Sequence, residues 1–148
     1  MKIIHHNKKA RHNYELSTKF EAGISLVGSE VKALREGRCN LGEGWVDLDT
    51  GEAILKDVHI GHYAQANIQN HEETRERRLL LQKHELKKLY QAVSQKGMAV
   101  VPIKIYFNKD SRIKLEIAIG KGKKLHDKRE ASKQRDAKRQ MEKALKAR

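Results

Sequence analysis

Residues 112–119 read Arg-Ile-Lys-Leu-Glu-Ile-Ala-Ile, and residues 120–130 continue as Gly-Lys-Gly-Lys-Lys-Leu-His-Asp-Lys-Arg-Glu. Apolar side chains recur at every second position of the first stretch, which predicts a half-buried strand that closes a hydrophobic core. The alternation stops at Gly120. From there to Arg148 the chain has twelve Lys or Arg and four Asp or Glu, so this segment carries +8 of the formal net charge of +13. The sequence therefore predicts a folded body followed by a basic tail that cannot build a core of its own.

The totals allow one domain of modest size, because the chain has 148 residues, 38% of them hydrophobic and 34% charged. An isoelectric point near 9.9 predicts a polyanionic partner, either nucleic acid or an acidic membrane surface. No apolar run approaches the length of a membrane span. The single Cys39 excludes an intrachain disulfide framework and a zinc cluster built from cysteines. We expect a soluble, reduced, cytoplasmic protein.

The N-terminal half predicts an arm, a strand and a helix. Residues 1–13 are polar and basic and are expected to order late or on binding. Residues 20–26 alternate as a strand, which starts as early as Tyr14. A short helix follows over 29–35, with Ser29 as its N-cap and Glu30 in its positive first turn. On this helix Lys32 and Arg35 are three residues apart and share one face, while Val31 and Leu34 face inward.

The second half predicts a hairpin, a loop, a helix and two strands. These elements are a hairpin of 45–48 and 52–58, a loop over 59–71, a charged lead-in over 72–78 to residues 79–81, a helix over 83–95, and strands over 98–107 and 112–119. Pro102 favours an edge position or a bulge for its strand. About six strands interrupted by two helices predict a mainly β fold with peripheral helices, a small closed or partly closed antiparallel barrel of the oligonucleotide-binding (OB) type. The predicted divisions are an arm over 1–13, the barrel over 14–119 and the hinge and tail over 120–148.

The tail could be a solubilising extension, an RNA-binding segment or a membrane-binding helix. Apolar side chains recur at i, i+4 and i+8 in it, at Ala137, Met141 and Leu145, with Lys and Arg on the other faces. A helix this highly charged is marginal in water, and a groove-shaped polyanion would neutralise it. One Met and one Leu give too weak an apolar face for a membrane surface.

The glycine- and lysine-rich residues 120–124 lack the spacing and the Ser or Thr of a nucleotide-binding P-loop. Lysines that contact an RNA backbone are the better interpretation, and the ring of His126 could stack on an unpaired base. His59 and His62 near Asp57, and His5 and His6 with His12, are weak metal candidates because a third ligand at suitable spacing is missing. No nucleophile with a base is apparent, so we expect a protein that is not an enzyme and needs no cofactor or metal.

Several stretches together resemble the bacterial small protein B family, the SsrA (tmRNA)-binding proteins of trans-translation. In the N-terminal half these stretches are Asn7–His12, Phe20–Ile24, Gly28–Gly37 and Asn40-Leu41; in the C-terminal half they are Arg78–Leu81, Val101–Phe107, Gly120–Arg129 and Arg135–Arg139. The resemblance covers nearly the whole chain. It implies an OB-type barrel and a non-enzymatic RNA adaptor that binds the tRNA-like domain of tmRNA. It also implies partners: alanyl-tRNA synthetase and elongation factor Tu acting through tmRNA, and the decoding centre and mRNA channel of a stalled ribosome.

The resemblance also implies particular site residues. Those expected to contact tmRNA are Asn7, Lys8, Arg11, Glu30, Lys32, Arg35, Lys121, Lys123 and Lys124. Those expected at the decoding centre and along the tail are His126, Asp127, Lys128, Arg129, Arg135, Lys138 and Arg139, in a tail that is disordered when free and helical on the ribosome. The sequence departs from the family at residues 72–78, Glu-Glu-Thr-Arg-Glu-Arg-Arg, where added acids put an RNA contact by Arg75 and Arg77 in doubt. The rival interpretation is a structural ribosomal protein or another non-enzymatic RNA-binding module.

Overall fold

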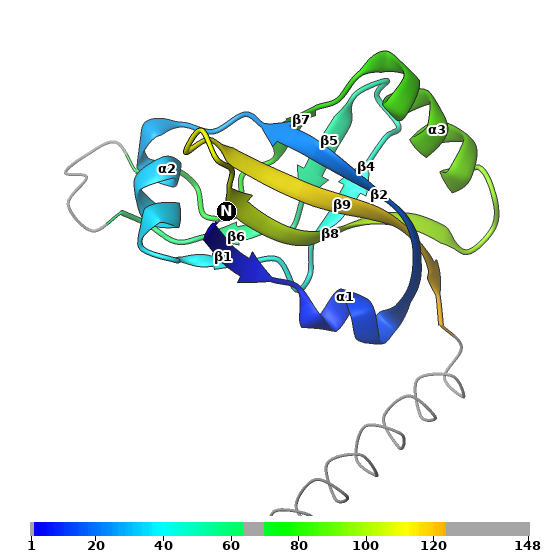
Figure 1. The fold of residues 1–148 in the computed structure, drawn as a ribbon, viewed down its shortest axis with the longest axis horizontal. Helices are drawn as coiled ribbons and strands as arrows, with labels where there is room; N and C mark the ends of the chain where they lie inside the picture. The colour runs from blue at the N-terminus through cyan, green and yellow to red at the C-terminus, as the bar shows by residue number, and fades with distance from the viewer. Residues whose placement is uncertain (1, 64–69, 124–148) are drawn as a thin grey trace, which may run out of the picture.

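The long strand β9, Ile113–Gly122, lies inside a seven-stranded antiparallel sheet with the order β1-β8-β9-β2-β7-β5-β4 (Figure 1). A second, two-stranded sheet pairs β3 with β6. The computed structural model describes residues 2–63 and 70–123. Along the chain the elements are β1 Lys2–His6, α1 Lys8–Asn13, β2 Tyr14–Ile24, α2 Gly28–Arg35, β3 Cys39–Asn40, β4 Trp45–Asp47, β5 Ala53–Lys56, β6 His59–Ile60, β7 Arg77–Leu80, α3 Lys83–Val93, β8 Met98–Phe107 and β9.

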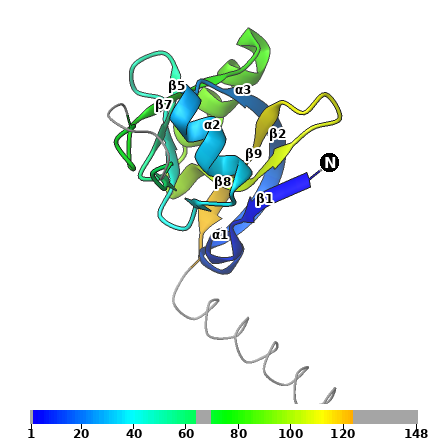
Figure 2. The ribbon, with the colours of Figure 1, turned by 90° about the vertical axis from the view of Figure 1, so that its left-hand side faces the viewer.

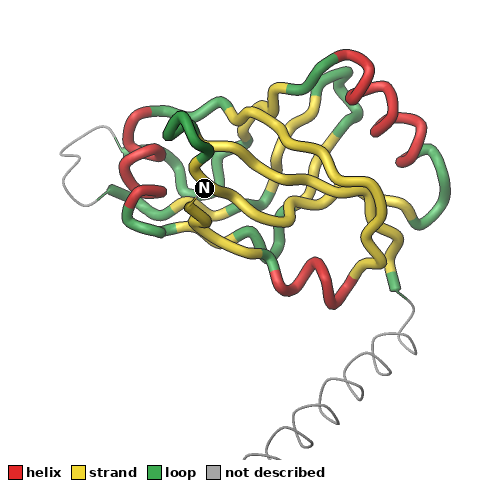
Figure 3. The backbone as a smooth tube through the Cα atoms, in the orientation of Figure 1, coloured by secondary structure: helices red, strands yellow, loops and turns green. Residues whose placement is uncertain are grey.

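The alternating apolar residues of β9 form the centre of the core, as predicted. Leu115 pairs in register with Ala22 of β2 and Ile105 of β8, and all three are fully buried. The core continues into α2 and α3, which contribute Leu34 and Leu89. These helices lie at opposite ends of the strands (Figures 1 and 3). An end-on view places α2 across one end of the barrel (Figure 2).

The sheet curls until its last strand, β4, contacts β8. Gly44, just before β4, makes this approach possible. A Cβ atom at Gly44 would lie 2.5 Å from Val58 Cγ2 and 2.9 Å from Pro102 Cγ. The result is a small, partly closed antiparallel barrel with peripheral helices, so the predicted fold class is confirmed. In the described part of the chain no helix has the length and apolar character needed to cross a membrane.

The prediction of a loose arm over residues 1–13 is wrong for residues 2–13. β1 pairs with β8, and α1 covers the outer face of the sheet, where Ala10 packs with Val101, Ile103 and Ala118 in a second buried cluster. The arm had no visible periodicity because β1 is an irregular edge strand with a register shift between Ile3 and His5. Its stability comes from pairing with a strand almost a hundred residues away.

Three other boundaries also differ from the predictions. The segment expected to be a loop from residue 59 begins with the two-residue strand β6, which is too short to show a period. The strand expected to end at Ile119 continues through Gly120, whose Cβ would meet Tyr14 Cβ at 3.0 Å, so glycine here permits close packing within the sheet. The N-cap of α2 is Val27 rather than Ser29. Pro102 lies at a register irregularity in the pairing of β8 with β9, which confirms the bulge. On its other side β8 pairs with β1 only from Lys104 to Phe107, so Pro102 lies beyond the end of β1.

Replacing Gly44 with Ala should lower the free energy of unfolding by about 1–3 kcal/mol, because the added methyl group meets two buried side chains that cannot move away. Gly28→Ala is the matched control, since nothing lies within 4 Å of its Cβ position, and it should leave stability unchanged or raise it by up to about 1 kcal/mol. Urea unfolding of both variants measures the difference. Equal stability of the two variants would contradict close contact between Gly44 and β8.

Candidate nucleic-acid interface

Asn7 fixes the start of α1 and is buried with 2% exposure. Its Nδ2 donates hydrogen bonds to the carbonyl oxygens of Leu41 (3.1 Å) and Pro102 (2.8 Å). Its Oδ1 accepts a hydrogen bond from the N–H of Ala10 at 3.1 Å, and its own N–H donates to Ile103 O at 2.7 Å. Because these bonds engage the side chain inside the fold, Asn7 holds α1 in place instead of projecting toward a ligand. The resemblance implied an RNA contact at Asn7, where the structure shows a buried side chain that anchors α1.

Lys8 and Arg11 are both exposed on α1, one helical turn apart. Lys123 joins them at the end of β9, where its N–H donates to Asn13 O at 3.0 Å and its Nζ donates to Arg11 O at 3.3 Å. We call Lys8, Arg11 and Lys123 the α1 basic cluster. Lys121 is exposed two residues earlier in β9, opposite Glu15. The structure therefore brings together two regions that are more than a hundred residues apart in the sequence.

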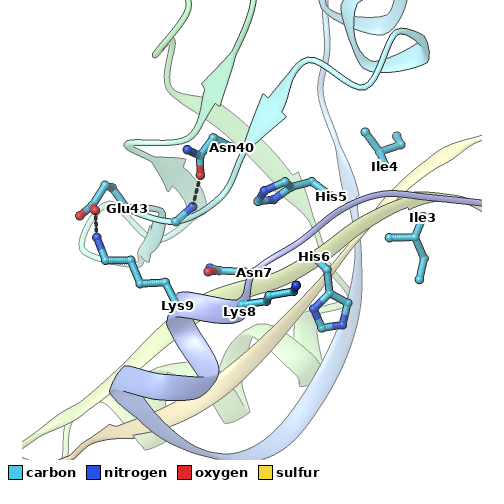
Figure 4. Close-up of a pocket in the computed structure, with 10 residues that line it drawn as sticks. Ile3, Ile4, His5, His6, Asn7, Lys8, Lys9, Asn40 and Glu43 are labelled. Carbon is cyan, nitrogen blue, oxygen red and sulfur yellow. Dashed lines mark hydrogen bonds and ion pairs between the residues drawn. The ribbon is translucent and has the colours of Figure 1, made fainter. Parts of the chain in front are cut away.

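A cleft of about 580 Å³ opens between β1, the start of α1 and the loop after β3 (Figure 4). His5 points into it, and its Nδ1 accepts a hydrogen bond from Leu41 N–H at 3.3 Å, which leaves Nε2 as the protonated nitrogen of the neutral ring. Burial, and secondarily the neighbouring His6, lowers the pKa of His5 and favours this neutral form. Lys9 pairs with Glu43 across one end of the cleft. A neutral ring flanked by lysines is suited to an unpaired nucleotide.

Lys32 and Arg35 are exposed on α2, as their spacing predicted. Lys32 Nζ lies 5.3 Å from the centre of the Tyr63 ring, a cation–π distance. β1 connects this end of the barrel to the α1 basic cluster. Lys2 at its start lines a cleft with Arg35, and Lys8 lies two residues after its last residue, His6. The predicted cations thus lie at the two ends of one edge of the sheet (Figure 1).

Glu30 lies on the same helix but is fully buried. Its carboxylate accepts hydrogen bonds from Arg75 Nη2 at 2.6 Å and from Val27 N–H at 2.9 Å, and it also accepts one from Arg77 Nε. Burial alone would raise the pKa of Glu30, but the bonds from Arg75, Val27 and Arg77 outweigh it and hold the pKa below its ordinary value. The predicted RNA contact by Glu30 is replaced by this internal role.

Arg77 is also fully buried, and its other nitrogens donate to Val58 O at 2.9 Å and Glu73 O at 3.1 Å. Burial lowers its pKa, but a guanidinium stays charged in a protein. Arg77 is therefore engaged inside the protein, and not by the added carboxylates of residues 72–78 that put its RNA contact in doubt. Its partner is the protein's own Glu30, a contact between distant segments that no local spacing could reveal.

The histidines do not form a metal site in residues 2–63 and 70–123, where no group of three or more His, Cys, Asp or Glu is arranged to hold an ion. His59 and His62 both contact Glu73, the latter at 3.4 Å from Nδ1. Outside the described residues lie Lys124 and all the predicted tail residues: His126, Asp127, Lys128, Arg129, Arg135, Lys138 and Arg139. Their roles stay predictions.

A family model described as SmpB protein matches residues 4–147. The chain belongs to the SmpB family. Its relatives include the SsrA-binding proteins of Rhizobium meliloti strain 1021, 50% identical over 99% of this chain and 92% of the relative, and of Moorella thermoacetica, 45% identical over 100% and 96%. A solved structure described as "tmRNA-SmpB: a journey to the center of the bacterial ribosome" superposes with a TM-score of 0.71 and 40% identity, covering 86% of this chain and 93% of that chain. The resemblance found in the sequence is confirmed.

The buried position of Glu30 yields a prediction that no SmpB sequence motif supplies. Glu30→Ala should lower the free energy of unfolding by about 3–5 kcal/mol, because it leaves the Arg77 charge buried and unpaired. Glu52→Ala is the control, since its pair with Arg78 is exposed and 3.4 Å long and should contribute about 0–1 kcal/mol. Chemical unfolding at neutral pH measures both.

The Glu30–Arg77 ion pair also predicts that the free energy of unfolding depends on pH. The pKa of Glu30 in the folded protein lies below its ordinary value of 4.5, so its contribution to stability is complete above that pH and is lost as the pH falls through the folded pKa. The stability difference between the parent and Glu30→Ala should therefore narrow below about pH 4.5. A stable Glu30→Ala variant that has lost only RNA affinity would restore the original prediction for this residue.

Proposed function

We propose that this chain is an RNA-binding adaptor of trans-translation that binds the tRNA-like domain of tmRNA. The observation that carries the proposal is family membership over nearly the whole chain, among relatives named SsrA-binding proteins. In this proposal the protein promotes the alanylation of tmRNA by alanyl-tRNA synthetase and its delivery by elongation factor Tu. It acts without catalysis of its own, in the cytoplasm, where ribosomes stall.

The charge arrangement of the body supports an RNA surface. Among the described residues, no ion pair engages the cations predicted to contact tmRNA: the exposed Lys8, Arg11, Lys32, Arg35 and Lys121, and the half-buried Lys123. Other cations, such as Lys56, do pair with carboxylates. Cations that are not paired with a carboxylate can neutralise phosphates without breaking an ion pair, and each neutralised phosphate releases counterions.

The tail completes the proposed function. We assign His126, Asp127, Lys128 and Arg129 to the vacant decoding centre, and Arg135, Lys138 and Arg139 to the mRNA channel beyond it. Twelve Lys or Arg between residues 120 and 148 provide the charge for a channel walled by rRNA phosphates. Affinity purification from cells, followed by sequencing of the bound RNA, tests the proposal directly. Recovery of ribosomal RNA alone, resistant to high-salt washing, would favour a structural ribosomal protein.

The log–log slope of tmRNA affinity against salt concentration should fall in Lys8→Ala and in Lys32→Ala, by up to about 0.7–0.9 each, if each lysine neutralises one phosphate. Lys88→Ala on α3 is the control, because this exposed lysine lies at the opposite end of the barrel from α2 (Figure 1). Filter binding at several salt concentrations measures the slopes. A slope that neither Lys8→Ala nor Lys32→Ala changes would place the RNA elsewhere on the protein.

A chain that ends at Lys123 should fold as well as the parent, because it keeps every sheet pair and backbone hydrogen bond of the described residues, including the pair of Gly122 with Tyr14 and the bond from Lys123 N–H to Asn13 O. It should bind tmRNA more weakly and fail to support tagging on stalled ribosomes. A chain that ends at Ile119 is the comparison: it loses the pairs of Gly120 with β2 and β8 and should melt at a lower temperature. Normal tagging by the chain that ends at Lys123 would contradict the role proposed for the tail.

A further inference from the structure

We propose that a cleft at the C-terminal end of α2 seats a backbone phosphate of the bound RNA together with its nucleoside. This inference rests on the proposed function and adds a site to it. The cleft has a volume of about 520 Å³ and is lined by Lys2, Arg35, Phe107, Asn108, Lys109 and Ser111. Of these residues, the sequence analysis singled out only Arg35 as an RNA contact.

Three separate elements bring the cations of the cleft together. Lys2 begins β1 and pairs in register with Phe107, the last residue of β8. Arg35 is the last residue of α2, and Lys109 lies in the turn between β8 and β9. Figures 1 and 2 both show this turn beside the start of β1. The juxtaposition depends on the tertiary structure alone, because the three residues are widely separated in the sequence.

The turn that carries Lys109 is held rigid by Asn108. Its Oδ1 accepts hydrogen bonds from the N–H groups of Asp110 (3.0 Å) and Arg112 (2.9 Å). Its backbone exchanges two more, with Ser111 N–H at 3.0 Å and Arg112 O at 2.8 Å. Ser111 has a φ of +59°, a left-handed conformation that is unfavourable for a residue other than glycine and that the hydrogen bonds of Asn108 hold in place. A turn fixed in this way presents Lys109 to the cleft with little loss of entropy on binding.

The cleft concentrates positive charge that the protein does not neutralise. Within residues 2–63 and 70–123, Lys2, Arg35 and Lys109 take part in no ion pair, and Glu36, next to Arg35, pairs instead with Arg38 at 3.1 Å. The dipole of α2 favours a cation at Arg35, but it does not account for Lys2 and Lys109, which lie off the helix. A bound phosphate would relieve the mutual repulsion, and the arginine fork matches its geometry.

The size and lining of the cleft favour an RNA nucleotide over a free phosphate ion. A volume of about 520 Å³ lies in the range of small-molecule sites and leaves space for a ribose or base beside the phosphate. The half-buried aromatic ring of Phe107 offers a surface for such a group, the combination of cations and aromatics that single-stranded RNA binds. Lys32 lies one turn before Arg35 on α2 and extends the positive surface beyond the cleft, where it can face the next part of the RNA backbone.

The test compares tmRNA binding by the full-length parent, Lys2→Gln, Lys109→Gln and the double variant over a range of salt concentrations. We expect each single substitution to lower the log–log slope by up to about 0.9 and the double variant to weaken binding at least about fivefold. The control is Lys87→Gln with Lys88→Gln, two exposed lysines on α3, which should leave slope and affinity unchanged. Circular dichroism of each variant establishes that it is folded.

Amide NMR shifts of Lys109 to Ser111 separate the two sources of phosphate. Titration with a tmRNA transcript should move them, whereas inorganic phosphate at matched ionic strength should move them far less. Movement with inorganic phosphate but not with RNA would overturn the proposal in favour of a free-anion site. Cleft variants that match the parent in slope and affinity would overturn it while leaving the proposed function intact, and a parent that does not bind tmRNA would overturn both.

Discussion

The position of α2 depends on the buried ion pair between Glu30 and Arg77. Two charges with no exposure to solvent are tolerable only when their hydrogen bonds are satisfied, and here the carboxylate and the guanidinium engage Val27, Val58, Glu73 and Arg75 as well as each other. The pair thereby joins α2 to β7 and to the segment between β5 and β6. Ser29 adds a bond of 2.9 Å to His71, whose other nitrogen bonds Ile60 O at 2.8 Å. With its inner face fixed in this way, α2 presents Lys32 and Arg35 to solvent.

A second constraint acts on the opposite side of the sheet. Without α1, the outer face of the sheet would expose Ala118 of β9 and Val101 of β8. Asn7 fixes α1 there through hydrogen bonds to the loop after β3 and to β8. The same helix then carries Lys8 and Arg11 on its exposed face. On each of the two helices, therefore, a buried polar residue orients the exposed cations nearby: Glu30 does so on α2, and Asn7 does so on α1. This explains why residues expected to touch RNA divide into an exposed basic group and a buried structural group.

The two basic regions share β1 as their connection, and β1 is an edge strand. An edge with unpaired backbone groups is a hazard for aggregation, and positive charge together with a register shift at Ile3 and His5 protects it. A polyanion that bound along this edge would contact Lys2, the cleft at His5 and the α1 basic cluster in turn. The positive charge that protects this edge strand from aggregation is thus the same property that suits it to bind RNA.

The sequence by itself determined the elements whose periodicity is local. The alternation of residues 113–119 predicted β9, and the apolar stripe of Leu86, Leu89, Tyr90 and Val93 predicted α3. The turn Asp49-Thr50-Gly51 predicted the hairpin of β4 and β5, in which Gly51 has a φ of +86°. Motifs spread over both halves of the chain, from Asn7–His12 to Arg135–Arg139, were sufficient to recognise the family. These signals are readable because each depends on neighbours within a few residues.

Only the tertiary structure decided the roles of Asn7, Glu30 and Arg77 and the identities of Lys2 and Lys109 as neighbours of Arg35. The resemblance implied RNA contacts for Asn7 and Glu30. A sequence does not show that both side chains are buried, because their hydrogen-bond partners lie up to 95 residues away. The short strands β1, β3 and β6 were missed for the same reason, since two to five residues are too few to show a period and their stability comes from pairing with distant strands. Local chemistry thus specifies elements, whereas burial and proximity between distant segments decide which polar groups remain available to a partner.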